Sequence, residues 1–370
     1  MRIGSFEFNM RELAGSLGDF GTLLPLAIGY ISVCGLDPAG LLVMMGLANI
    51  ATGVVYRLPM PIEPMKVLAA VAIAERWTPE TVYASGFVMG IVWLVMGATG
   101  AMDYVARNTP RSVLRGIQLS LAVMLAVQGI RMASTWWLLG AASVVVIVLL
   151  RKSRYTPASI VLVAGGILIM YLQGWPEGLP GIGVSLPPIA MIDGSRLWPA
   201  FRDAGMAQIP LTATNAVIAT SVLITEYWPD RRVTNRQLAV NMGVMNVIAP
   251  LAGGMPMCHG AGGLAGQYYF GARTGGANII EGVIEILLGV LLAGSVAAVF
   301  AAFPEAIVGA MMVMVGVGMA KFARDLRPNR HLVTVIATVG ASLATNMAVG
   351  FGAGLAVHAV MKRVLPPLRR

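Results

Sequence analysis

The stretch Pro59-Met60-Pro61-Ile62-Glu63-Pro64-Met65-Lys66 interrupts an otherwise apolar run with three prolines and two opposite charges. Proline fixes φ, lacks a backbone N–H and pushes the preceding residue towards extended conformations, so this stretch predicts extended chain. Pro64 suits the first position of a new helix, which is expected from Met65 to about Glu75. Because a membrane span needs about 20 residues, that helix is too short to cross a bilayer. The sequence therefore predicts a helix that begins inside the membrane.

The composition is typical of an integral membrane protein. Of the 370 residues, 57% are hydrophobic and 12% are charged. Roughly 14 spans of about 20 residues would use most of such a chain and leave almost no soluble domain. The two cysteines, Cys34 and Cys258, are too few for a disulfide framework and lack metal-ligand spacing. We therefore expect no metal, no cofactor and, since no nucleophile and base pair is visible, no enzyme activity.

A second interruption, from Gly253 to Gly263, repeats the first. Met45-Gly-Leu-Ala-Asn49 followed by Pro59-Met60 matches Met242-Gly-Val-Met-Asn246 followed by Pro256-Met257, and every identical pair is 197 residues apart. Each half is expected to hold seven segments, and an odd number brings the second half into the membrane from the opposite side. Inverted repeats with broken helices place substrates near the bilayer midplane. The sequence predicts an all-α polytopic membrane protein of 14 transmembrane segments in a 7+7 inverted repeat, whose third and tenth segments are half-helices preceded by short extended segments.

The domain boundaries follow from a Pro/Gly-rich stretch, Gln173 to Arg202, that has no sustained apolar run. We expect residues 1–175 to form the first repeat, residues 176–204 an extracytoplasmic connector and residues 205–370 the second repeat.

The net charge of +9 could indicate a nucleic-acid partner, but the positions of the basic residues argue against it. With the N-terminus in the cytoplasm, the outside loops receive only Arg76, Arg131, Arg196 and Arg202 of the 26 lysines and arginines. This asymmetry follows the positive-inside rule. It predicts a multi-pass protein of the bacterial cytoplasmic membrane, with both termini cytoplasmic, lipid around it and no nucleic acid.

The two interruptions together predict an anion site. A helix N-terminus carries unpaired N–H groups and partial positive charge, and two half-helices from opposite sides can direct both ends at one point. The glycines from Gly260 to Gly263 leave the backbone open to a ligand. Lys66 and His259 add donors, although Lys66 could instead neutralise Glu63 and His259 could have a structural role.

Neighbouring spans add polar groups. Asp19 and Glu63 are candidates for proton coupling, because ionisable groups inside a membrane are costly. A threonine in a span more often bonds to its own helix backbone, so the threonines are weaker candidates. The predicted substrate-binding residues are Thr22, Glu63, Pro64, Met65, Lys66, Thr212, Asn215, Cys258, His259, Gly260, Ala261, Gly262 and Gly263.

At these residues the chain resembles the molybdate transporter family related to the sulfate permeases. The resemblance rests on Glu12-Leu-Ala-Gly-Ser-Leu-Gly-Asp-Phe-Gly-Thr-Leu-Leu-Pro25, on Pro59 to Lys66, and on Pro256-Met-Cys-His-Gly-Ala-Gly-Gly-Leu-Ala-Gly-Gln267 with Phe270-Gly-Ala-Arg273. It implies the uracil permease and sulfate permease fold, with core and gate domains built from both repeats and substrate between the third and tenth helices. It also implies molybdate uptake, and relatives of this fold often form homodimers through the gate domain. The regulatory domain of many sulfate permeases is not expected here.

One departure concerns Glu63, where the family usually has glutamine. A carboxylate beside a dianion site would repel it unless it were protonated or paired with Lys66, so substrate or proton coupling could be altered.

The leading hypothesis is a secondary active importer of a tetrahedral oxyanion, molybdate above all, that works by alternating access and is a candidate for proton symport. The alternatives are a transporter of sulfate, tungstate or a nucleobase with the same fold, and a passive anion channel or membrane-embedded sensor. A nucleobase site would need aromatic side chains for stacking. The interruptions themselves contain none, and Tyr268 and Tyr269 lie downstream of the second one.

Overall fold

The computed structural model describes residues 2–17, 20–150, 158–174, 183–320, 326 and 330–364. Within these ranges four helices are long and apolar enough to cross a membrane, at Pro38–Tyr56, Pro79–Thr99, Arg111–Leu150 and Gly194–Tyr227. Two shorter apolar helices lie at Glu305–Met314 and His331–Ala344. The molecule is thus a mostly helical, multi-pass membrane protein.

The elements of the first half, in chain order, are β1 (Arg2–Ile3), β2 (Phe6–Glu7), α1 (Met10–Ser16), α2 (Phe20–Ser32), α3 (Pro38–Tyr56), β3 (Glu63–Pro64), α4 (Lys66–Ala74), α5 (Pro79–Thr99), α6 (Ala101–Asn108), α7 (Arg111–Ala133), η2 (Ser134–Trp136), α8 (Trp137–Leu150) and α9 (Ala158–Leu172).

Those of the second half are α10 (Gly194–Ala200), η3 (Phe201–Gly205), α11 (Met206–Leu211), η4 (Thr212–Ile218), α12 (Ala219–Tyr227), α13 (Asn235–Ile248), η5 (Ala249–Ala252), β4 (Met257–Cys258), α14 (Ala261–Phe270), α15 (Gly276–Leu291), α16 (Ala293–Ala302), α17 (Glu305–Ala320), α18 (Arg330–Ala344) and α19 (Met347–Val364). Several helices begin at matching places in the two halves: α13 begins 197 residues after α3, and α15 begins 197 residues after α5.

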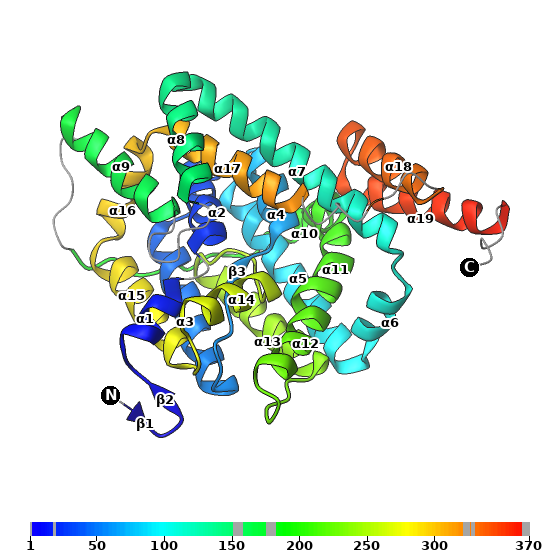
Figure 1. Ribbon diagram of the computed structural model, residues 1–370, viewed down its shortest axis with the longest axis horizontal. Helices are drawn as coiled ribbons and strands as arrows, with labels where there is room; N and C mark the ends of the chain where they lie inside the picture. Colours follow the sequence, from blue (N-terminus) through cyan, green and yellow to red (C-terminus); the bar gives the residue numbers. More distant parts are fainter. Residues whose placement is uncertain are drawn as a thin grey trace.

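The helices form two groups, which lie side by side in Figure 1. In one group α3 packs against α15 and α5 against α13, so each pair joins the two halves of the chain. In the other group α7 packs against α17 and α18, and α18 packs against α19. Small residues permit the close approach: a Cβ on Gly129 of α7 would lie 2.6 Å from the carbonyl oxygen of Gly309 in α17.

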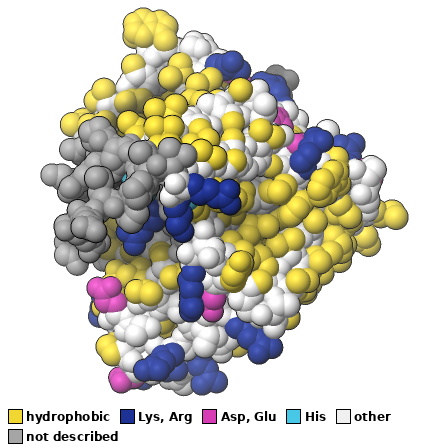
Figure 2. Space-filling view, turned by 90° about the vertical axis from the view of Figure 1, so that its right-hand side faces the viewer, with side chains coloured by type: hydrophobic (Ala, Val, Ile, Leu, Met, Phe, Trp, Pro, Cys, Tyr) yellow, Lys and Arg dark blue, Asp and Glu magenta, His cyan; other side chains and the backbone are white. Residues whose placement is uncertain are grey.

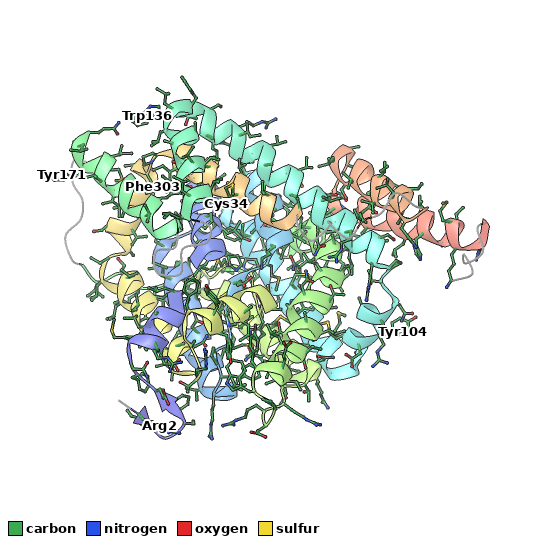
Figure 3. All side chains as sticks on the ribbon, viewed as in Figure 1. Arg2, Cys34, Tyr104, Trp136, Tyr171 and Phe303 are labelled. Carbon is green, nitrogen blue, oxygen red and sulfur yellow. The ribbon has the colours of Figure 1, made fainter. Side chains whose placement is uncertain are left out.

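Some of the large aromatic side chains lie at the periphery of the helical body, although others such as Trp93 and Tyr30 are buried in its core. Tyr104, Trp136 and Tyr171 are at its edges in Figure 3, whereas Cys34 is inside it. Tyr104 is 71% exposed and Tyr171 68%, while Cys34 is 4% exposed. Exposed aromatic side chains of this kind are typical of proteins that meet the membrane–water interface.

A helix begins at Gly194, inside residues 176–204, the stretch predicted as the connector between the halves. Asp193 caps it by accepting a hydrogen bond from the backbone N–H of Ser195. The helical run continues to Tyr227 through two π-helical segments, η3 and η4. Pro199 and Pro210 lie inside this run, and the shift to wider π turns accompanies these breaks in its hydrogen bonding.

Candidate functional site

The two proline-rich interruptions lie side by side as one antiparallel ladder, β3 with β4. Glu63 is opposite Cys258, and Pro64 is opposite Met257. The backbone N–H of Met65 extends the pairing by donating to the carbonyl of Pro256 over 3.0 Å. Backbone that is not helical survives at membrane depth only when protein or water satisfies it, and here each interruption satisfies part of the other. The two helices that follow the ladder, α4 and α14, therefore begin at the same place, although they are about 200 residues apart in the sequence.

The first of these helices, α4, is capped by a residue that sequence reasoning missed. Gln208 of α11, only 2% exposed, accepts a hydrogen bond at Oε1 from the backbone N–H of Val67 over 2.9 Å. Its Nε2 donates to the hydroxyl oxygen of Thr212 over 2.7 Å. Thr212, a predicted substrate ligand, therefore holds Gln208 in position. No sequence signal marked Gln208, because its role depends on how α11 packs against α4.

The second helix, α14, begins with open backbone. Gly260 is its extended N-cap residue and supplies no side chain for capping. Of the described residues, none accepts a hydrogen bond from the N–H groups of Ala261, Gly262 or Gly263. Gly262 is exposed, and a Cβ on it would have nothing within 4 Å. Among the described residues, the start of α14 therefore has backbone donors without an acceptor and space beside Gly262, which is the arrangement that binds anions.

The ladder also carries an ion pair between Lys66 and Glu63. The Glu63 side chain is 2% exposed, whereas Lys66 keeps 28% of its side-chain surface exposed. The Glu63 carboxylate lies against the backbone of Gly260, where a Cβ would be 2.6 Å from its Oε1. Gly260 is required because the carboxylate occupies the place of a side chain. The sequence left open whether Lys66 neutralises Glu63, and in the structure the two side chains form this ion pair.

The structure favours the structural alternative for His259. The side chain is 1% exposed, its Nδ1 lies 3.2 Å from the carbonyl oxygen of Pro61, and its Nε2 lies 3.0 Å from Oδ1 of Asn241. The ring of Tyr56 meets it edge-on, with ring centres 6.0 Å apart. Since both ring nitrogens already have partners, His259 fixes the extended chain before Glu63.

Each of the two interruptions is held by a buried asparagine through the same pair of backbone hydrogen bonds, an arrangement that we call an asparagine clamp. Asn246 of α13 accepts from the backbone N–H of Met257 over 2.8 Å and donates to its carbonyl over 2.6 Å. Asn278 of α15 makes the same pair of bonds with Met60, also over 2.8 and 2.6 Å. Asn49 accepts from Asn278 over 2.8 Å. The repeat in the sequence pointed to Asn49 and Asn246, but nothing in it pointed to Asn278.

The remaining predicted residues are placed as follows. Asp19 lies outside the described residues, and Thr22 lies in α2 without a described side chain. Met65 is fully buried and Cys258 is 4% exposed, so their side chains belong to the packed interior. Asn215, in η4, is exposed within the long helical run.

Half-helices that start inside a bundle of membrane-spanning helices define the class of transporters built on broken helices. A family model described as "Molybdate transporter of MFS superfamily" matches residues 11–125 and 200–319. The chain belongs to this molybdate transporter family.

Individual relatives agree with the family match. The chain is 31% identical to "Molybdate transporter 1" of Arabidopsis thaliana, over 96% of this chain and 89% of that protein. It is 30% identical to "Molybdate transporter 1" of Chlamydomonas reinhardtii, over 94% of this chain and 91% of that protein. These relatives come from a plant and an alga, so residence in a bacterial membrane stays a prediction.

Solved structures show the same fold at low sequence identity. The transmembrane domain of the cyanobacterial bicarbonate transporter BicA superposes with a TM-score of 0.69 at 16% identity, covering 94% of this chain and 97% of that one. Murine Slc26a9, an anion transporter in the inward-facing state, superposes with a TM-score of 0.73 at 13% identity, covering 100% of this chain and 70% of that one.

Proposed function

We propose that the protein is a secondary active importer of molybdate, with the dianion bound where α4 and α14 begin. The observation that carries this proposal is the shared origin of the two half-helices at the β3–β4 ladder, where no described residue accepts from the first backbone N–H groups of α14 or fills the space beside Gly262. Helix N-termini favour negative charge, and a tetrahedral oxyanion can accept from several N–H groups at once. Lys66, partly exposed beside the ladder and paired with Glu63, is the nearby cation that could turn to the dianion.

Transport by alternating access is supported by the matched construction of the two halves. The helix starts that recur after 197 residues, and the two asparagine clamps, are what an inverted 7+7 repeat would produce. We propose that the group of α3, α5, α13 and α15, which holds the ladder, moves against the group of α7, α17, α18 and α19. The site would then open first to one side of the membrane and then to the other.

Glu63 gives the proposal a coupling element. Its carboxylate is buried, paired with Lys66 and in contact with Gly260. When Glu63 is ionised it holds Lys66, and when it accepts a proton Lys66 becomes available to the dianion. Proton uptake would then accompany anion binding and offset part of the charge carried inward. The pair is therefore proposed as the site of proton coupling.

Uptake into proteoliposomes tests the function. Purified protein is reconstituted, and molybdenum inside the vesicles is measured by mass spectrometry with and without an inward proton gradient. Accumulation against a molybdate gradient supports the importer, while absence of uptake in both conditions refutes it. Competition with sulfate and tungstate assigns the cargo, and downhill flux without accumulation would indicate a channel instead.

A further inference from the structure

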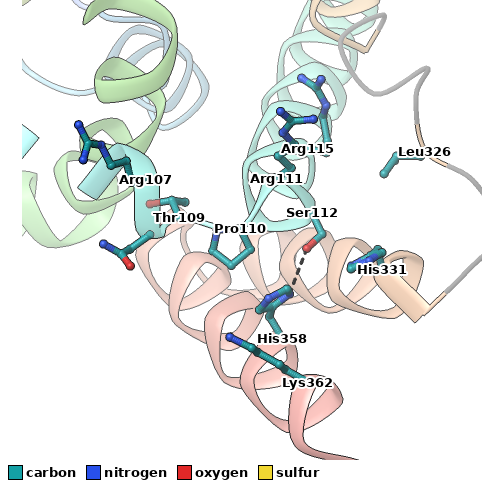
Figure 4. A pocket seen from close by; sticks show the side chains of 11 residues that line it. Arg107, Thr109, Pro110, Arg111, Ser112, Arg115, Leu326, His331, His358 and Lys362 are labelled. Carbon is teal, nitrogen blue, oxygen red and sulfur yellow. Dashed lines mark hydrogen bonds between the residues drawn. The ribbon is translucent and has the colours of Figure 1, made fainter. Parts of the chain in front are cut away.

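A second basic site lies away from the ladder, where the end of α6 and the start of α7 meet α18 and α19 (Figure 4). It is a cavity of about 500 Å³. Four cationic side chains line it, together with two histidines: Arg107, Arg111, Arg115, Lys362, His331 and His358. Among the described lining residues none is acidic. A pocket of this size and charge suits an anionic group larger than a simple ion.

The geometry of the pocket is fixed by its histidines and by α7. The rings of His331 and His358 stack with centres 6.2 Å apart, and Nδ1 of His358 lies 3.4 Å from the hydroxyl oxygen of Ser112 (Figure 4). Ser112 is in the first turn of the 23-residue helix α7, whose N-terminus adds partial positive charge. Arg107 and Arg111 are exposed and flank this turn. Their side chains are therefore in contact with solvent at the edge of the pocket.

The surroundings of the pocket are apolar. On α18, Val333 is 49% exposed and Ile336 62%, and on α19, Val360 is 57% exposed. Figure 2 shows Lys and Arg side chains at several places on this face of the molecule, together with a broad hydrophobic surface. Exposed apolar helix faces in a membrane protein are covered by acyl chains, so the pocket lies where a headgroup attached to such chains would be.

We propose that this pocket binds a phosphate group, most readily the headgroup phosphate of an anionic lipid, and so ties α6 and α7 to α18 and α19. Arginine recognises phosphate oxygens by paired, charge-assisted hydrogen bonds, and two neighbouring arginines at a helix start can hold one phosphate from two directions. The pocket is separate from the ladder and its occupant is not the transported anion.

The test compares two double variants of the purified full-length protein. Arg107→Gln with Arg111→Gln removes two pocket charges, and Arg231→Gln with Arg232→Gln removes two exposed charges from the loop between α12 and α13. Thermal unfolding in detergent is followed as phosphatidylglycerol, phosphatidylcholine or inorganic phosphate is added, and native mass spectrometry counts retained lipid.

We expect phosphatidylglycerol to stabilise the wild type and the loop variant, and to bind the pocket variant roughly 30-fold more weakly, since each basic residue contributes about a further fivefold. Saturation by inorganic phosphate alone would support the phosphate site and assign it to a free phosphate. Equal weakening in both variants, or no response to either phosphate source, would overturn the proposal. Molybdate uptake by the pocket variant should equal that of the wild type. A failure of the phosphate-site proposal can then be told apart from a failure of the proposed transport function.

Discussion

Replacing Asn246 or Asn278 by alanine is expected to destabilise the protein by about 2–6 kcal/mol, because each substitution removes two buried hydrogen bonds to one methionine backbone. The N–H and the carbonyl of Met257, or of Met60, would be left without partners. An unsatisfied buried polar group costs about 1–3 kcal/mol, and the two costs add. Asn278→Ala should be the more damaging change, because the side-chain oxygen of Asn49 loses its donor as well.

The assay is thermal unfolding of the detergent-purified protein, with molybdate uptake measured in parallel. For a chain of 370 residues the expected cost corresponds to a fall in Tm of about 3–8 °C. Asn108→Ala is the matched control, since among the described residues that exposed side chain donates to the carbonyl of Tyr104 in its own helix and to no other group. Its Tm should stay within about 1 °C of the wild type.

The reasoning fails if either clamp variant unfolds at the wild-type temperature. It also fails if the two variants fall in Tm no further than the control, because the asparagines would then contribute nothing to the ladder.

Four further variants test other contacts at the site and near the N-terminus. Gly262→Val should leave Tm unchanged, since a Cβ there meets nothing within 4 Å, yet lower molybdate affinity tenfold or more by covering the backbone donors, as titration calorimetry would show. Gly260→Ala should reduce both Tm and uptake, because its Cβ would lie 2.6 Å from Oε1 of Glu63. Glu63→Gln should tighten molybdate binding and remove the dependence of uptake on a proton gradient; unchanged coupling in this variant would exclude Glu63 as the proton site. Burial raises the pKa of Glu12 above 4.5 although Arg273 and Thr274 donate to it, so its contribution to stability is full below pH 4.5 and is lost as the pH rises through the raised value. Glu12→Gln should therefore show a flatter dependence of Tm on pH between 4 and 8, and an unchanged slope would contradict this.

The local structure of the interruptions could be predicted from the sequence because proline acts on its own neighbours. The three prolines and the repeat placed the first half-helix at Met65 to about Glu75, and the structure has it at Lys66–Ala74. The same reasoning predicted a second short helix after the second interruption, and this helix is α14 (Ala261–Phe270) in the structure.

What the sequence could not supply were contacts between distant segments. Gln208 caps α4 from 141 residues away, and Asn278 clamps Met60 from 218 residues away. Neither residue has a local pattern that distinguishes it from other polar residues on an apolar helix. The role of His259 could not be predicted for the same reason. Only its hydrogen-bonding partners, Pro61 and Asn241, distinguish a structural role from a ligand-binding one.

The start of α10 at Gly194 was missed for a different reason. The stretch before it is rich in proline and glycine, and Pro199 argues locally against a helix. The π turns that follow carry the helix past these residues, and they depend on packing rather than on local preference.

The most direct test of the account is the position of a bound heavy oxyanion in the full-length protein. Crystals grown with tungstate, which has the shape and charge of molybdate, would show its metal atom by anomalous scattering. The account predicts one strong peak beside Lys66, at a position from which an oxygen of the tungstate can accept a hydrogen bond from the Gly262 backbone N–H. A well-diffracting crystal with no peak at the β3–β4 ladder, or with tungstate only in the pocket around Arg107 and Arg111, would contradict it.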